Sequence, residues 1–162
     1  MWSRRRNLGA LLAGASLAAG AYYANRIEPA RVEVRELSLV LHRLQREFDG
    51  YRLALISDIH MDGWMTLDRI ASILELLNDQ EPDLVAIAGD YVTDTVMLDS
   101  RELSNALSQI EAKDGVVGVL GNHDYQADQR MIRRLIHQSD IVELANDVYT
   151  VRRGDAALHV AG

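Results

Sequence analysis

Three short apolar segments of this chain each end in side chains that can bind a metal ion. The segments cover residues 53–56, 84–88 and 116–120, and the polar side chains that follow them are Asp58 and His60, then Asp90, then Asn122 and His123. Carboxylate and amide oxygens and imidazole nitrogens are hard to borderline ligands, which suit Mn, Fe, Zn or Mg. The 162 residues include no cysteine, which excludes thiolate sites, disulfides and cysteine nucleophiles. The sequence therefore indicates a divalent-metal site built from oxygen and nitrogen ligands.

The elements that must position these side chains alternate along the chain. Each apolar segment has the length and continuity of a buried β-strand. Apolar residues recur at helical spacing at 66–77, from Asp99 to about residue 110, and at 127–137. This alternation predicts an α/β fold with a parallel sheet and right-handed crossovers, whose strands end at one shared edge. If strand geometry continues to the tip of the first strand, Asp58 and His60 point to the same side.

The expected site would have two carboxylates, an imidazole and an amide oxygen around one hollow. A central carboxylate can bridge two cations about 3.5–4 Å apart. Such a pair lowers the pKa of a bound water, and it binds the non-bridging oxygens of a phosphoryl group while charge develops. The residue types therefore point to metal-assisted hydrolysis of a phosphorylated substrate.

The residues around these side chains resemble the first three signature blocks of the calcineurin-like metallophosphoesterase superfamily. The blocks are Ser57-Asp58-Ile59-His60, Gly89-Asp90-Tyr91-Val92-Thr93-Asp94 and Gly121-Asn122-His123-Asp124. They occur in the superfamily's order, each after an apolar strand, and the chain looks most like the membrane-associated, twin-arginine-exported phosphodiesterase branch. The resemblance implies a four-layer α/β/β/α sandwich, with residues 50–162 as its N-terminal part. It also implies a hydrolase of phosphate ester or pyrophosphate bonds that uses two divalent metal ions.

The resemblance further implies a role for each side chain. Asp58 and His60 would hold one metal, Asp90 would bridge both, and Asn122 would ligate the second. His123 would lie near the leaving-group oxygen, as general acid or charge stabiliser, which is the place of a histidine that protonates a leaving alkoxide.

The residues that would orient the acid histidine depart from the superfamily's pattern. An acidic residue often stands three positions after the bridging aspartate, where this chain has Thr93. Asp94 is one residue further on, and Asp124 follows the histidine directly. We expect Asp94 or Asp124 to orient His123.

The superfamily also supplies later histidines, a lone His and a Gly-His-x-His segment, which this sequence lacks. His137 falls in a predicted helix and His159 in a predicted strand, so neither has the required context. We expect the 162 residues to be the N-terminal part of a longer protein, which alone would bind metals weakly. The alternative is a truncated, catalytically weak scaffold of the same fold, tethered to a membrane.

Residues 1–25 have the layout of a signal anchor or an export signal. Arginines at positions 4–6 precede an uncharged stretch at about 8–24, and the string 3–8 resembles a twin-arginine signal. We expect this segment to anchor the protein in the cell membrane with the bulk of the chain on the exported side, or to be cleaved at about Ala19–Ala21 so that the protein is secreted. The expected substrate is a phosphorylated small molecule or a phospholipid-type molecule facing that membrane.

The remaining segments complete the domain. Residues 26–49 read as a linker followed by one or two half-buried edge strands at 31–44, because apolar and polar residues alternate there. A short strand is expected at 141–144, and a hairpin at 148–151 and 156–160 around Arg153-Gly154-Asp155.

Charge and motifs argue against two other classes of protein. The net charge of −7 disfavours a nucleic-acid-binding surface, which must be cationic. A nucleotide-binding domain is disfavoured because the sequence has neither a G-x-G-x-x-G motif nor a P-loop lysine.

Overall fold

A computed structural model describes residues 14–28, 31–93 and 100–162 of the protein, which divides into two units, residues 1–40 and 41–162. In the first unit, residues 14–22 are α-helical and continue into the π-helical turn η1 (Tyr23–Ile27). Within the described ranges, no helix has both the length and the apolar character needed to cross a membrane. The predicted arginine-rich start of the signal lies outside the described residues.

The predicted edge strands at 31–44 are not formed in the described structure. Residues 31–41 have no regular secondary structure and are exposed, and they belong to none of the strands of the described sheets. Alternating apolar residues provide a strand with one apolar face, but a strand also needs a neighbour for its main-chain hydrogen bonds. The pattern alone could not supply that neighbour.

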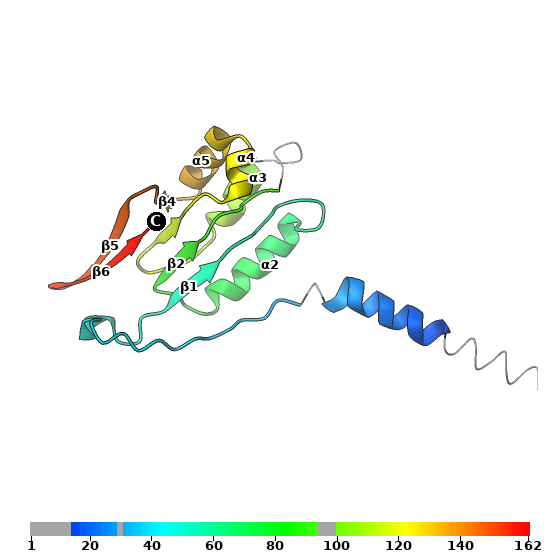
Figure 1. Ribbon diagram of the computed structural model, residues 1–162, viewed down its shortest axis with the longest axis horizontal. Helices are drawn as coiled ribbons and strands as arrows, with labels where there is room; N and C mark the ends of the chain where they lie inside the picture. Colours follow the sequence, from blue (N-terminus) through cyan, green and yellow to red (C-terminus); the bar gives the residue numbers. More distant parts are fainter. Residues whose placement is uncertain (1–13, 29–30, 94–99) are drawn as a thin grey trace, which may run out of the picture. The chain divides into compact units, whose positions relative to one another are not determined.

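The second unit is built on a parallel sheet of four strands (Figure 1). The strands lie in the order β1 (Leu53–Ile56), β2 (Leu84–Ile87), β3 (Val116–Gly118) and β4 (Ile141–Glu143). All three neighbouring pairs are parallel. The 3₁₀ turn η3 (Arg46–Phe48) precedes β1, and the antiparallel hairpin of β5 (Val148–Arg153) and β6 (Ala156–Ala161) ends the chain. The predicted parallel sheet and hairpin are thus confirmed.

The helices that connect the strands are α2 (Leu67–Asn78), α3 (Ser100–Leu107), α4 (Asn122–Gln126) and α5 (Gln129–Gln138). Thr66 is the N-cap of α2, although its side chain makes no capping hydrogen bond. Asp128 caps α5 by accepting hydrogen bonds from the main-chain N–H groups of Arg130 and Met131. The predicted third helix is therefore confirmed as α5, which starts slightly later than expected, and the short helix α4, which was not predicted, precedes it.

The main core lies between the sheet and the helices. Val85 and Ile87 of β2 belong to it, together with apolar residues from three helices. These helical residues are Ile70, Leu74 and Leu77 of α2, Leu103 and Leu107 of α3, and Ile132, Leu135 and Ile136 of α5. The apolar stripes predicted for the helices therefore do face the sheet.

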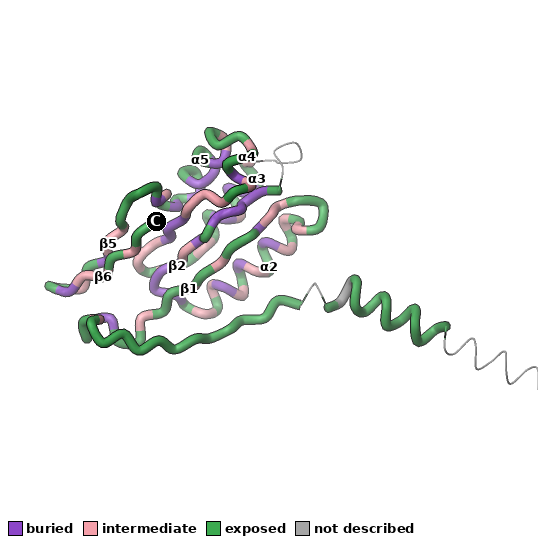
Figure 2. The backbone as a smooth tube through the Cα atoms, viewed as in Figure 1, coloured by how far each residue is buried: buried purple, intermediate pink, exposed green. Residues whose placement is uncertain are grey.

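The opposite face of the sheet is covered unevenly. Leu84, Val117 and Leu144 form a second buried cluster, against which Tyr149 and Val160 of the hairpin pack. By contrast, Leu53 and Leu55 of β1 keep 55% and 68% of their surface exposed, and Figure 2 shows the difference between β1 and β2. The described elements thus form a mixed α/β fold with a parallel sheet, which fits a metallophosphoesterase, and the complete four-layer sandwich remains a prediction.

Candidate metal centre

The three predicted blocks follow β1, β2 and β3 directly, at the carboxyl edge of the sheet. Beyond the strand ends, the first two loops continue side by side. The N–H of Asp58 donates to the carbonyl of Gly89 (3.2 Å), and the N–H of His60 donates to the carbonyl of Asp90 (2.9 Å). A parallel bridge between Met61 and Val92 follows. Main-chain hydrogen bonds therefore hold the first two blocks against each other.

Three candidate ligands adopt a backbone conformation that L-residues avoid. The φ angles of Asp58, His60 and Asp90 are 53°, 45° and 56°. The left-handed region costs a non-glycine residue about 1–2 kcal/mol, and such strain concentrates at functional sites. β1 ends at Ile56, so the predicted alternation along a strand is not what orients Asp58 and His60. The left-handed turns bring their side chains together instead.

Glycines allow the second and third blocks to approach closely. Gly89 has φ +91°, and a Cβ there would collide with the main chain of Leu120 and Gly121. A Cβ at Gly121 would in turn collide with Asp90. Only residues without a side chain fit these two positions, so the loop of Asp90 packs tightly against the residues that precede α4.

The side chains of the three blocks converge on one point. His60 Nε2 lies 3.5 Å from Asp58 Oδ1 and 3.7 Å from Asp90 Oδ2. His60, Asp90 and His123 each offer a ligand atom within 4.8 Å of the other two. The rings of His60 and His123 are nearly perpendicular, with centroids 4.7 Å apart.

These separations fit a shared cation. Ligand atoms bound at about 2.1 Å around a tetrahedral ion lie about 3.4 Å from one another, close to the spacing of the His60 nitrogen and the two carboxylate oxygens. The donor types also suit Mn, Fe, Zn or Mg. Asp90 is largely buried, with 11% of its side chain exposed, whereas Asp58 is 65% exposed. The site is therefore anchored on Asp90 and open to solvent on the side of Asp58.

Asp124 is buried between the second and third blocks. Its side chain is fully buried, and its carboxylate accepts main-chain N–H bonds from Asp90 (2.7 Å), Gly121 (2.9 Å) and Tyr91 (3.0 Å). Burial raises the pKa of Asp124, against the opposing effect of these N–H donors. Asp124 thus ties the second loop to the third, and its role in orienting His123 stays a prediction.

The third block also holds Asp90 directly. The main-chain N–H of His123 donates to Asp90 Oδ1 (2.9 Å), and the other oxygen, Oδ2, faces His60. Asn122, the first residue of α4, is exposed and adjacent to His123 in the chain. Asp94, the other residue predicted to orient His123, lies outside the described residues. The roles proposed for Asn122 and Asp94 stay predictions.

Two residues beside the cluster were not predicted to take part in it. The hydroxyl of Thr93 lies 3.3 Å from His60 Nδ1 and 3.5 Å from Asp62 Oδ2. Asp62 Oδ1 accepts the main-chain N–H groups of Trp64 and Met65, at 2.7 and 2.8 Å. These two hydrogen bonds hold the pKa of Asp62 below its usual value, and the bond from Met65 has the larger effect. The Asp62-Gly63 turn directly after the first block was the sequence signal that could have indicated this neighbour.

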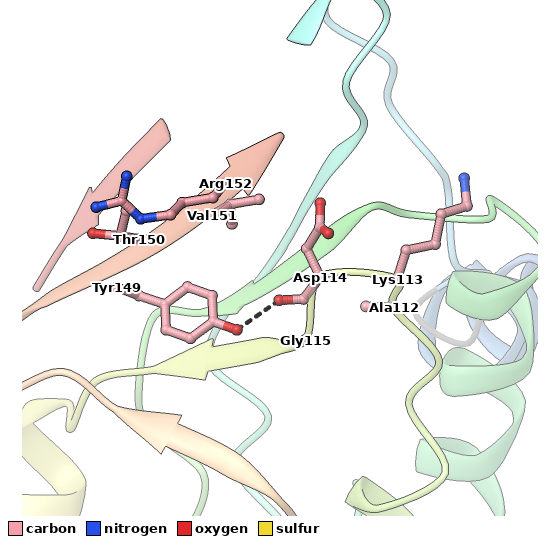
Figure 3. Close-up of a pocket in the computed structure, with 8 residues that line it drawn as sticks. All are labelled: Ala112, Lys113, Asp114, Gly115, Tyr149, Thr150, Val151 and Arg152. Atoms are coloured by element: carbon pink, nitrogen blue, oxygen red, sulfur yellow. Dashed lines mark hydrogen bonds between the residues drawn. The ribbon is translucent and has the colours of Figure 1, made fainter. Parts of the chain in front are cut away.

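A separate hollow of about 460 Å³ lies at the other edge of the sheet (Figure 3). Its lining comes from residues 112–115, which precede β3, and from residues 149–152 of β5. Tyr149 is one of the lining residues, and its hydroxyl donates to the carbonyl of Asp114 (2.8 Å). This hollow is remote from the carboxyl edge and contains none of the predicted ligands.

Comparison with known proteins identifies the family. Residues 51–157 match the model of the calcineurin-like phosphoesterase family. The chain is 31% identical over 129 residues to the uncharacterized metallophosphoesterase YkuE of Bacillus subtilis, covering 76% of this chain and 45% of that protein. It is 31% identical over 127 residues to the phosphodiesterase YaeI of Escherichia coli, with the same coverage of 76% and 45%.

A third relative has a named substrate. The UDP-2,3-diacylglucosamine pyrophosphatase LpxG of Chlamydia muridarum is 28% identical over 103 residues, covering 64% of this chain and 31% of that protein. The chain therefore spans less than half the length of these relatives. The matched residues include all three blocks that form the cluster, and the protein belongs to the calcineurin-like phosphoesterase family.

Proposed function

We propose that the protein hydrolyses phosphate ester or pyrophosphate bonds with two divalent metal ions held at the carboxyl edge of the sheet. The family is one of hydrolases acting on phosphate esters, and its relatives include a phosphodiesterase and a pyrophosphatase. The single observation that carries the proposal is the convergence at His60: its Nε2 lies 3.5 Å from Asp58 Oδ1 and 3.7 Å from Asp90 Oδ2, and His123 offers a ligand atom to the group of His60 and Asp90.

In this proposal, Asp58 and His60 hold one ion, Asp90 contributes to both, and Asn122 completes the second. Bound divalent cations supply a water of lowered pKa and neutralise phosphoryl oxygens. The chain's own residues arrange the reacting groups. Asp90 is fixed through one oxygen by the N–H of His123, which leaves Oδ2 directed at His60.

His123 is the proposed general acid. Its ring stands against His60, so it borders the cluster from the side of the third block. From there its imidazole could deliver a proton to the leaving-group oxygen. The alternative, that His123 is itself a ligand, is compatible with its place in the group of His60 and Asp90.

The leaving group distinguishes these two roles. A basic leaving group needs a proton in the transition state, whereas p-nitrophenolate does not. If His123 is the acid, His123→Ala should slow hydrolysis of phenyl phosphate esters far more than that of p-nitrophenyl esters and should leave metal affinity nearly unchanged. Equal losses with both substrates, accompanied by loss of metal, would assign His123 as a ligand.

We also propose that the substrate faces a membrane and carries a lipid-type group. The arginine-rich N-terminal segment supports this, as does a relative named for hydrolysis of UDP-2,3-diacylglucosamine. The prediction is a higher kcat/KM for a diacylated nucleotide diphosphate sugar in mixed micelles than for its deacylated counterpart. Equal values for the two would remove the lipid from the proposal.

The activity itself is tested with bis-p-nitrophenyl phosphate and Mn²⁺ on the full chain. Asp90→Asn should reduce hydrolysis to background, while Asp155→Asn, which removes an exposed carboxylate in the hairpin turn, should not. Activity that does not depend on Asp90 would contradict the proposed site. Absence of both metal binding and hydrolysis would favour the scaffold.

A further inference from the structure

The exposed aromatic side chains of residues 41–162 lie next to the candidate metal centre in the chain. Trp64 and Tyr125 keep 50% and 53% of their surface exposed, whereas the other described aromatic residues of this unit are buried or half-buried. Trp64 is in the loop that joins the first block to α2, and Tyr125 is in α4, directly after the third block. Aromatic side chains that stay exposed on loops beside a site are candidates for contact with a ligand.

Trp64 is held in place without being buried. Its neighbour Met65 packs against the main core, whereas Trp64 belongs to no hydrophobic cluster of the described residues. The main-chain N–H groups of both residues donate to Asp62 Oδ1, at 2.7 and 2.8 Å. The guanidinium of Arg69 lies over the Trp64 ring, 4.1 Å from its centroid, and donates to the Trp64 carbonyl (3.2 Å). The backbone and the ring are therefore both fixed from within the loop and α2.

The same turn contacts the first two blocks of the site. The second oxygen of Asp62, Oδ2, lies 3.5 Å from the hydroxyl of Thr93, and that hydroxyl lies 3.3 Å from His60 Nδ1. The turn that carries Trp64 is thus attached by short side-chain contacts to a candidate metal ligand. A ligand bound at the metal centre would have the Trp64 turn as a neighbour.

The ring of Trp64 suits a flat partner. Arg69 lies over one face of the ring, as a cation–π pair, and half of the Trp64 surface is still exposed. Aromatic groups such as nucleobases stack on tryptophan, and a ring that is already ordered loses little entropy when they bind. The charge of Arg69 also favours an anionic ligand close by.

The surroundings of Trp64 argue against a lipid surface as its partner. Side chains that enter the membrane interface combine several apolar residues with lysine or arginine. Around Trp64, the exposed residues of the loop and of the first turn of α2 include the acidic Asp62 and Asp68. Exposed carboxylates on both sides of the ring are unfavourable at an anionic membrane.

We propose that Trp64 is a specificity-determining residue that stacks on the nucleobase of a nucleoside phosphate or diphosphate substrate. The inference rests on the proposed function for the place of the phosphoryl group, which lies at the metal centre. It narrows the substrate from phosphate esters in general to those that carry a flat aromatic ring. Arg69 supports the ring from the face that the base does not use.

The test compares two probes that differ only in the base, uridine 5′-monophosphate and ribose 5-phosphate. Each is titrated by NMR into the ¹⁵N-labelled full chain with Mg²⁺, and main-chain amide signals give the affinity. The chain has two tryptophans, so the indole N–H signal of Trp64 is identified by its loss in Trp64→Phe. We expect uridine monophosphate to shift this signal and to bind about 5- to 150-fold more tightly than ribose 5-phosphate, the range that base stacking on an aromatic residue provides.

Variants separate stacking from a general effect on the fold. Trp64→Ala should abolish the preference for the probe with the base, and Trp64→Phe, which keeps a ring, should retain most of it. Val148→Ala removes an exposed apolar side chain from the hairpin and should not change it. Circular dichroism shows whether all four proteins share one fold.

Three results would overturn the inference. They are a wild type that binds both probes equally, a preference that survives in Trp64→Ala, and an indole signal that moves with dodecylphosphocholine micelles but not with uridine monophosphate. The last result would assign Trp64 to a lipid surface. Hydrolysis of bis-p-nitrophenyl phosphate is measured separately: its absence would contradict the proposed function, while the two probes would still decide the role of Trp64.

Discussion

Aspartate side chains lie at both edges of the parallel sheet, but their charged neighbours differ between the two edges. At the amino edge, Asp83 Oδ1 is bound by Arg153 (3.0 Å) and Lys113 (3.2 Å), and Arg153 also reaches Asp114 (3.2 Å). At the carboxyl edge, among the described residues, the only basic side chain within ion-pair distance of Asp58 and Asp90 is a histidine.

This difference separates a structural cluster from a candidate binding cluster. Arg153 belongs to the hairpin, and its guanidinium also lies over the rings of Phe48 and Tyr51, so the amino-edge charges attach the hairpin to the sheet. Carboxylates that are already paired with basic side chains are poor ligands for a metal cation. At the carboxyl edge, negative charge stays available, and the backbone strain indicates that this arrangement is maintained at a cost. A cluster of carboxylates therefore does not by itself identify a metal site. The basic side chains around the carboxylates distinguish a structural cluster from a candidate binding cluster.

The largest expected effect comes from the close loop approach at the carboxyl edge. Gly89→Ala should destabilise the protein by about 3 kcal/mol, because it adds left-handed strain to a collision with the third loop. Gly154→Ala is the matched control: it has φ +61° but open space around the added carbon, so it should cost only about 1 kcal/mol. Urea unfolding measures both, and equal losses would show that the loop contact is not tight.

A somewhat smaller loss is expected at the amino edge. Asp83 is buried and accepts the main-chain N–H of Arg52 (2.8 Å) in addition to its two ion pairs. Asp83→Ala should therefore cost about 2 kcal/mol by leaving these donors unsatisfied. Mn²⁺ affinity should not change, and a parallel loss of metal binding would mean that the two edges are not independent.

The amino edge should also contribute to the loss of folding stability at low pH. Burial alone would raise the pKa of Asp83, but the Arg52 N–H and the Lys113 and Arg153 side chains hold it below its ordinary value. An aspartate in an unfolded chain titrates near pH 3.9. The stability that Asp83 contributes is therefore fully present above about pH 4 and is lost as pH falls through the lower folded pKa. Asp83→Asn should flatten this acid limb in unfolding curves measured at several pH values, and an unchanged limb would assign it to other groups.

The smallest effect is expected inside the hollow at the amino edge. Tyr149→Phe removes one hydrogen bond, from the hydroxyl to the carbonyl of Asp114, and leaves the ring in place. The cost should be about 1 kcal/mol. A much larger loss in a thermal scan would indicate that the hollow is more tightly coupled to the hairpin than its contacts suggest.

At the carboxyl edge, sequence patterns predicted the parallel strands but not the backbone turns that follow them. The parallel strands followed from continuous apolar runs, and the block spacing brought Asp58, His60 and Asp90 together. Strand alternation was expected to place Asp58 and His60 on the same side, yet β1 ends at Ile56 and left-handed turns set the orientation of both residues. Hydrophobic patterns carry no information on such turns when the residues are aspartate and histidine rather than glycine.

Other features depended on contacts that no local pattern encodes. Asp124 reads as a neighbour of His123 in sequence, but its carboxylate binds main-chain N–H groups of two loops. Thr93 contacts His60 across 33 residues of chain. The alternation at 31–41 suggested a strand, and the described structure leaves that segment exposed. Each of these outcomes is decided by a partner that is distant in sequence.

The central claim is that the carboxyl edge, and not the amino edge, binds divalent cations. Calorimetric titration of Mn²⁺ into the wild type, Asp90→Asn and Asp83→Asn tests it directly. We expect the wild type and Asp83→Asn to bind with the same affinity and Asp90→Asn to bind at least about 100-fold more weakly, since it loses a ligand rather than an outer partner. Binding that survives in Asp90→Asn, or that disappears in Asp83→Asn, would contradict the account.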